Sequence, residues 1–224
     1  TFTIEPAERD TRGTTLIITL KEDAKEYLET YKLKEVVRHH SNYIAFPIHV
    51  DDEEEPANKQ TAIWRSDPKN ITDEEYNEFY KSMTYDWEDP LHRIHMRADT
   101  PLQFYALMYV PSKTNRDMLI NREPGLQLFA RKVLIQEKTT ELLPDYLQFV
   151  QGVVDSEDLP LNVNRESMQA NRVIGALKKT LTTKVLTELK RVMKNKPDEY
   201  HQIFENFGRF LKQGVVVSPV EAAD

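Results

Sequence analysis

The sequence contains no cysteine, which excludes disulfide bridges, thiolate zinc sites and cysteine nucleophiles. It has only six glycines in 224 residues, and they stand apart from one another at positions 13, 125, 152, 175, 208 and 214. Neither GxGxxG nor GxxxxGK can be drawn from them, so neither a dinucleotide-binding loop nor a P-loop is available. If the protein uses a nucleotide, another part must hold it.

Long apolar runs and a basic excess are missing as well. The longest apolar runs, such as Ile44–Pro47 and Val215–Val217, are too short to span a bilayer. The net charge of −7 argues against a nucleic-acid binder that relies on bulk electrostatics, because neutralising phosphates needs clustered Lys and Arg. We therefore expect a soluble globular protein with neither nucleic acid nor membrane as its partner.

The hydrophobic pattern predicts strands that are followed by long helices. Thr72 and Glu75 form a capping box that opens one helix, and Pro144 suits the first turn of another. Strands are expected at 14–20, 44–50, 92–98, 103–110 and 127–135, and further helices at 22–40, 172–194 and from Pro197 to near Gly214. This order indicates an α/β or α+β fold, a layered α/β domain followed by a helical unit.

The histidines show no metal-binding spacing. His39 and His40 are adjacent, so they point apart on a helix, whereas His92 and His95 are three apart on an expected strand and face opposite sides. We therefore predict no metal site. The acidic run DDEEEPA at 51–57 is interpreted as a solvated linker and the best domain boundary.

Trp87 lies between acidic residues and a proline in DWEDPL, so deep burial is not expected. It indicates either an exposed contact surface or a partly buried anchor of its loop.

Three carboxylates crowd into VVDSEDLPLN at 153–162. Asp155, Glu157 and Asp158 repel one another unless basic side chains meet them, so we expect lysine or arginine partners from elsewhere in the fold. The following Leu159–Leu161 turn around a proline pins a loop, and Asn162 can shape it by bonding its own backbone.

Arg165 and Gln169 follow, four residues apart and therefore on one face of a helix. The guanidinium of arginine offers a fork of donors and a permanent charge, which suits the oxygens of a phosphate. The alternative interpretation is structural, with Arg165 in a salt bridge to Glu166 or to the acidic run.

The segment FVQGVVDSEDLPLNVNRE at 149–166 resembles the catalytic-loop signature of the heat-shock protein 90 family of molecular chaperones, whose bacterial form is high-temperature protein G. The family pattern is also visible at 62–95, 109–113 and 128–138. Upstream, GTTLIITLKEDAKEYLE and LKEVVRHHSNYIAFPI resemble the end of the family's nucleotide-binding domain and the passage into its middle domain. The resemblance covers practically all of the chain.

The resemblance implies a domain organisation. Residues 1–50 are expected to be the end of the ATP-binding domain and its connector, and 51–58 a short acidic linker. Residues 59–224 are expected to be the middle domain, with an α/β sandwich to about 170 and a helical unit over 171–224 that leads into a small α/β unit. The family's dimerisation domain is not covered, so we expect a monomeric fragment of a protein that is a homodimer at full length.

The resemblance also implies a site. Arg165 matches the arginine that contacts the γ-phosphate of ATP held by the preceding domain, and Gln169 and Asn162 match its companions on the loop. Asn164 stands where the family usually has serine. Leu134 matches an apolar position that supports this loop.

The implied cofactor is ATP with Mg²⁺ in the full-length protein, with none bound to this fragment, which should not hydrolyse ATP alone. The implied partners are the protein's own N-terminal ATP-binding domain, unfolded client proteins and cochaperones, and Trp87 matches a tryptophan implicated in client contact. The expected location is the cytoplasm, with the mitochondrial matrix as the alternative because RKVLIQ resembles that branch.

The sequence leaves two alternative functions. One is a non-catalytic module that docks clients or cochaperones, with Arg165 in a structural role. The other, a self-sufficient enzyme using the carboxylates at 155–158, has little support because no nucleophile–base arrangement is visible.

Overall fold

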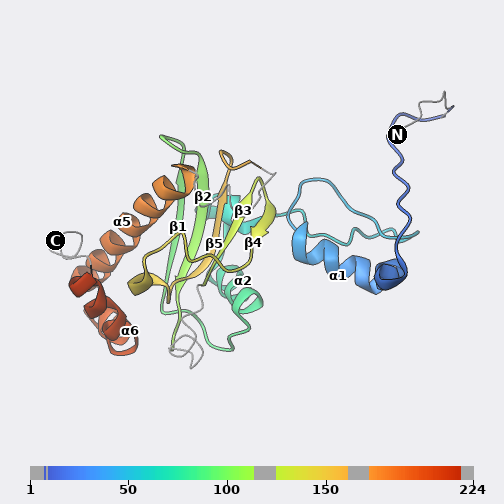
Figure 1. Cartoon of the computed structure of the whole chain (residues 1–224). Coiled ribbons are helices and arrows are strands. Elements are labelled where there is room, and N and C mark those ends of the chain that lie inside the picture. Colours follow the sequence, from blue (N-terminus) through green and yellow to red (C-terminus); the bar gives the residue numbers. More distant parts are fainter. Residues whose placement is uncertain (1–7, 9, 114–124, 161–171, 218–224) are drawn as a thin grey trace.

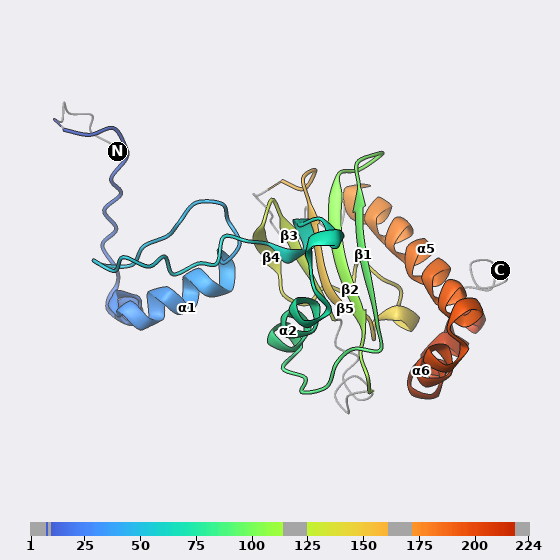
Figure 2. The same ribbon diagram turned by 180° about the vertical axis from the view of Figure 1, so that it is seen from behind.

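The structure, a computed structural model, describes residue 8 and residues 10–113, 125–160 and 172–217. A five-stranded sheet lies at its centre, with the long C-terminal helices on one side (Figure 1). The opposite face of the sheet carries a shorter helix and the turns that precede it, as the view from behind shows (Figure 2). The predicted layered α/β sandwich followed by a helical unit is confirmed.

The sheet consists of β1 (His92–Ala98), β2 (Phe104–Val110), β3 (Gly125–Ala130), β4 (Val133–Gln136) and β5 (Gln151–Ser156), in the order β1-β2-β5-β3-β4. β2 runs antiparallel to β1 and β5, whereas β3 runs parallel to β5 and antiparallel to β4. Because β5 is the middle strand, the chain leaves the centre of the sheet just before residues 161–171.

The helices are α1 (Thr30–His40), α2 (Asp73–Thr84), α5 (Arg172–Asn195) and α6 (Pro197–Val217), together with the 3₁₀ turns η1 (Glu22–Leu28), η2 (Ile63–Arg65), η3 (Pro68–Asn70) and η4 (Asp145–Leu147). The capping box opens α2 as predicted. Thr72 Oγ1 accepts from the Glu75 amide at 3.2 Å, and Glu75 Oε2 accepts from the Thr72 amide at 2.8 Å. Within the described ranges, no helix has the length and apolarity needed to cross a membrane.

Strand alternation divides the core between the two faces of the sheet. Leu107 and Val153 point to one face, where they pack with Trp64 and the tyrosines of α2. Their neighbours Met108 and Val154 point to the other face, where they pack with η4 and the apolar sides of α5 and α6. Side chains along these strands point alternately to the two faces, but those on both faces are apolar, as expected for strands that are buried on both sides.

Two predicted strands are wrong. Residues 14–20 form no strand, and Leu16, Ile17 and Ile18 are 80%, 88% and 68% exposed, because no neighbouring strand among the described residues supplies hydrogen bonds. Residues 44–50 are not a strand either. There the backbone bonds the side chain of Asn58 instead: its amide donates to Ile44 O and Phe46 O, and its oxygen accepts from Ile48 N at 2.9 Å.

Three further expectations need correction. The segment 127–135 is a hairpin of β3 and β4, not one strand, because Arg131 and Lys132 turn the chain with φ of 50° and 68°. The helix expected after Pro144 is only the single turn η4. The helix over 22–40 is broken at Glu29, whose backbone is extended.

The expected boundary at 51–58 stays a prediction. Residues 51–56 are exposed and form neither helix nor strand. The N-terminal part nevertheless contacts the sandwich, because His39 Nε2 lies 2.8 Å from Glu137 Oε1 beyond β4, and Tyr43 packs edge-on against Trp64 with ring centroids 4.5 Å apart.

Candidate functional site

Asp155, near the end of the middle strand β5, is fully buried and has three donors around it. Its Oδ2 accepts from Trp64 Nε1 at 2.9 Å and from Arg65 Nε at 2.6 Å, and its Oδ1 accepts from the Lys132 amide at 3.1 Å. The two side-chain donors come from η2 and the amide from the β3–β4 turn. Three elements far apart in the sequence therefore meet on one carboxylate.

Arg65 extends this network to Glu157. Its Nη1 bonds Glu157 Oε1, and its guanidinium lies 4.6 Å from the ring centroid of Tyr105. Burial alone would lower the pKa of the Arg65 guanidinium, but the hydrogen bonds and charges of Asp155 and Glu157 raise it above its usual value. Arg65 is therefore a permanent cation that neutralises two of the three crowded carboxylates.

The third carboxylate, Asp158, has a different partner. Its Oδ2 accepts from the Gln103 amide at 2.7 Å, and the Glu157 amide donates to Gln103 O at 3.0 Å. Leu159, next along the chain, is fully buried in the core beneath α5. The expected basic partner is thus confirmed for Asp155 and Glu157, while Asp158 bonds backbone instead.

The β3–β4 turn also bonds the end of β5. The Arg131 amide donates to Ser156 O, and Arg131 Nε donates to Glu157 O, both at 3.2 Å. Leu134 on β4 pairs with Phe129 and packs, partly buried, against the cluster around Trp64. Leu134, which the resemblance assigns to loop support, therefore packs beside the residues that bind Asp155. Its effect on the loop stays a prediction.

Asn162, Asn164, Arg165 and Gln169 lie outside the described residues, so their roles stay predictions. What the structure describes is the chain on either side of them: β5 and its ion-pair network before, and α5 from Arg172 after. We call the network of Trp64, Arg65, Lys132, Asp155 and Glu157 the loop root.

Trp87 is 93% exposed and Tyr85 is 87% exposed, in the connection after α2. This connection is tied down: Tyr80 Oη donates to Asp86 Oδ2 at 2.9 Å, and Glu88 accepts from Ser112 Oγ at 2.9 Å and from Lys113 Nζ. The Lys113 and Ser112 donors hold the pKa of Glu88 below its usual range. Trp87 is therefore exposed and is not a partly buried anchor of its loop, while its use as a contact surface stays a prediction.

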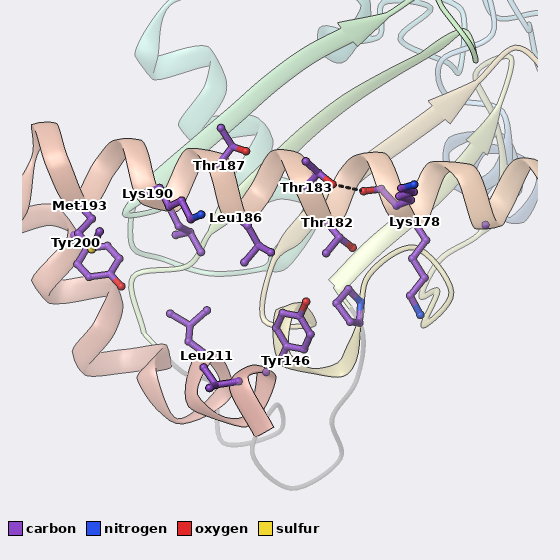
Figure 3. A pocket seen from close by; sticks show the side chains of 16 residues that line it. Tyr146, Lys178, Thr182, Thr183, Leu186, Thr187, Lys190, Met193, Tyr200 and Leu211 are labelled. Atoms are coloured by element: carbon purple, nitrogen blue, oxygen red, sulfur yellow. Dashed lines mark hydrogen bonds between the residues drawn. The ribbon is translucent and has the colours of Figure 1, made fainter. Parts of the chain in front are cut away.

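A groove that the sequence analysis did not predict runs between α5, α6 and η4, with a cavity volume of about 880 Å³. Apolar side chains of both helices face it, and Lys178 and Lys190 lie along its α5 side (Figure 3). The sequence shows only the basic character of its α5 side, since α5 carries seven Lys or Arg against the single Glu188 in a chain of net charge −7.

No group of metal-binding side chains occurs among the residues that the structure describes. His92 and His95 do face opposite sides of β1, as predicted, and both are hydrogen bonded.

A sheet covered on both faces, with a buried ion pair near the end of its middle strand, defines a layered α/β domain. A family model described as Hsp90 protein matches residues 49–221. The chain belongs to the Hsp90 family.

Individual relatives agree with this assignment. The chaperone protein HtpG of Myxococcus xanthus is 40% identical over 228 residues, which is 96% of this chain and 35% of the relative. The HtpG of Methylorubrum populi is 43% identical over 220 residues, with coverage of 96% and 35%, and that of Borreliella burgdorferi is 36% identical over 230 residues, with coverage of 96% and 37%. This chain therefore spans about a third of the length of these relatives.

Proposed function

We propose that this chain is part of an ATP-dependent molecular chaperone and completes a split ATPase site. Arg165 is the residue assigned to the γ-phosphate of a nucleotide that the preceding domain holds, with Gln169 beside it and Asn162 shaping the loop. The observation that carries the proposal is the loop root: Asp155, Arg65 and Glu157 fix the strand end from which this loop departs. A side chain that contacts a reacting phosphate must be anchored in a fixed position, because a small displacement of its charged group loses much of the rate enhancement.

The donor chemistry fits a phosphate. Guanidinium and amide groups donate to phosphate oxygens, and an arginine brought from a second domain stabilises the charge that develops during phosphoryl transfer. The chain's six isolated glycines offer no phosphate loop of its own, so ATP and Mg²⁺ belong to the preceding domain. Hydrolysis would then depend on the two domains closing on each other.

Client binding is the second part of the proposal. An exposed Trp87 on a tied-down connection suits the apolar segments of unfolded proteins, because aromatic side chains supply large contact areas at little entropic cost. The bacterial source of the relatives favours the cytoplasm over the mitochondrial matrix.

The test is ATP turnover by the longer parent protein carrying Arg165→Ala. We expect turnover to fall roughly tenfold or more, because an interaction with the developing charge is lost. Arg172→Ala, which removes a charge seven residues further on, is the matched control and should turn over ATP at the wild-type rate. If the wild type, Arg165→Ala and Arg172→Ala turn over ATP equally fast, Arg165 has a structural role and this domain is a docking module.

A further inference from the structure

His92, the first residue of β1, joins the sheet to both C-terminal helices. Its side chain is only 7% exposed. Nε2 lies 3.0 Å from Glu188 Oε1 of α5, and Nδ1 lies 2.6 Å from Glu199 Oε1 in the first turn of α6. One imidazole thus touches three elements, at the corner where α5 ends and α6 begins.

Each of these carboxylates also has a cation from its own side of the corner. Arg191 Nε donates to both oxygens of Glu188 at 3.0 Å, and Lys196 Nζ lies 2.8 Å from Glu199 Oε2. The hydrogen bonds from Arg191 lower the pKa of Glu188 although its burial acts in the opposite direction. Glu188 therefore only accepts hydrogen bonds, and Glu199 faces His92 with Oε1 while its Oε2 pairs with the Lys196 ammonium.

A neutral imidazole carries one N–H, whereas an imidazolium carries two. Only the imidazolium can donate to Glu188 and Glu199 together. His95 on the same strand is the contrast, since it faces the Tyr76 hydroxyl at 2.7 Å and Trp64 O at 3.0 Å, a pair that a neutral ring satisfies. Burial lowers the pKa of His95, in keeping with a neutral ring.

We propose that His92 is a proton-operated latch that ties β1 to α5 and α6 as an imidazolium and releases the start of α6 when it loses its proton. Glu199 is the contact that opens, because the Glu188 side chain is only 12% exposed and Arg191 bonds both of its oxygens, whereas the Glu199 side chain is 21% exposed and contacts Lys196 through Oε2. Release is confined to the first turns of α6, because Ile203 and Phe207 further along are fully buried. Low pH therefore stabilises the contact between β1 and the start of α6, and high pH weakens it.

The latch is tested on the chain 1–224 by NMR and by hydrogen exchange. At about pH 6, within the range where histidine changes charge, ¹⁵N shifts should show both ring nitrogens of His92 protonated. Exchange is then followed at the Tyr200 amide, which donates to Lys196 O in the first turn of α6, and at the Lys196 amide, which donates to Val192 O at the end of α5. We expect their protection to fall about tenfold on going to about pH 8, once intrinsic rates are corrected, because a charged hydrogen bond is lost.

Two variants isolate the latch. His92→Gln cannot be protonated, so its protection at these amides should be equal at both pH values. His201→Gln is the matched control, because His201 pairs with Glu205 at 3.1 Å on the exposed side of the same helix, and it should behave like the wild type. If His92→Gln does not fold, Glu199→Gln serves instead and should likewise lose the pH dependence.

Two results would overturn the proposal. One is a His92 ring with a single protonated nitrogen at about pH 6. The other is the same loss of protection with pH in the wild type and in His92→Gln or Glu199→Gln.

Discussion

Trp64 Nε1 and Asp155 Oδ2 are hydrogen bonded at 2.9 Å across 91 positions of sequence, inside the protein and next to the Arg65 guanidinium. This contact joins η2 to the middle strand and makes the loop root a single unit. We expect Asp155→Ala to lower the free energy of unfolding by about 3–5 kcal/mol, because it leaves buried donors without their acceptor.

Urea unfolding of the chain 1–224 measures this effect. Asp99→Ala is the matched control, since it removes an aspartate from a surface pair with Arg97 in which both side chains are about 60% exposed. The control should change stability little. If Asp155→Ala unfolds at the same urea concentration as the control, the loop root is not a structural unit.

Two glycines should respond oppositely to alanine. Gly152 on β5 has φ of 144°, and a Cβ there would lie 2.8 Å from Met108 Cα of β2, so Gly152→Ala should cost at least about 3 kcal/mol of unfolding free energy. Gly175 is exposed in α5 and a Cβ there meets nothing within 4 Å. Gly175→Ala should therefore gain about 0.5–1 kcal/mol. Thermal and urea unfolding of both variants would check the opposite signs.

Glu188 predicts an acid dependence of stability. Its pKa is held low in the folded protein, chiefly by Arg191, so the unfolded chain takes up the proton first as the pH falls. The resulting stability is present above the ordinary glutamate range and is lost as the pH falls through the lowered folded pKa. In urea titrations, the difference in unfolding free energy between wild type and Glu188→Gln should shrink steadily from about pH 6 to about pH 3. A difference that stays constant over this range would contradict the assignment.

Trp87 should matter for binding and not for stability. Because it is 93% exposed, Trp87→Ala should change the unfolding free energy by less than about 0.5 kcal/mol. The affinity for a fluorescently labelled, permanently unfolded polypeptide should fall about tenfold in the parent protein, as for an aromatic anchor of an interface. Phe46→Ala is the control, because Phe46 is 78% exposed but lies in another segment. Equal losses in both variants would remove any special role of Trp87.

The sequence predicts best where local chemistry decides the structure. The capping box of Thr72 and Glu75 and the long helix with Leu177, Leu181 and Val185 at four-residue spacing are local patterns, and both are present. It also predicts that the crowded carboxylates Asp155, Glu157 and Asp158 need basic partners, and Arg65 pairs with the first two. Which base meets them could not be predicted, since Arg65 lies 90 positions away.

The failures share a non-local cause. Residues 14–20 have the composition of a strand but find no partner strand within the described residues, and Asn58 supplies the bonds that 44–50 would have taken from a sheet. The sequence pattern did not predict β5 as a strand. Its polar Asp155 is compatible with the centre of a sheet only because Trp64 and Arg65 arrive from elsewhere.

The role of Arg165 in a split ATPase site is tested most directly by measuring both nucleotide affinity and ATP turnover in the parent protein carrying Arg165→Ala. We expect turnover to fall roughly tenfold or more while affinity stays within about twofold, because the arginine acts on the developing charge and the preceding domain holds the nucleotide. Unchanged turnover would contradict it, as would a loss that appears only in affinity.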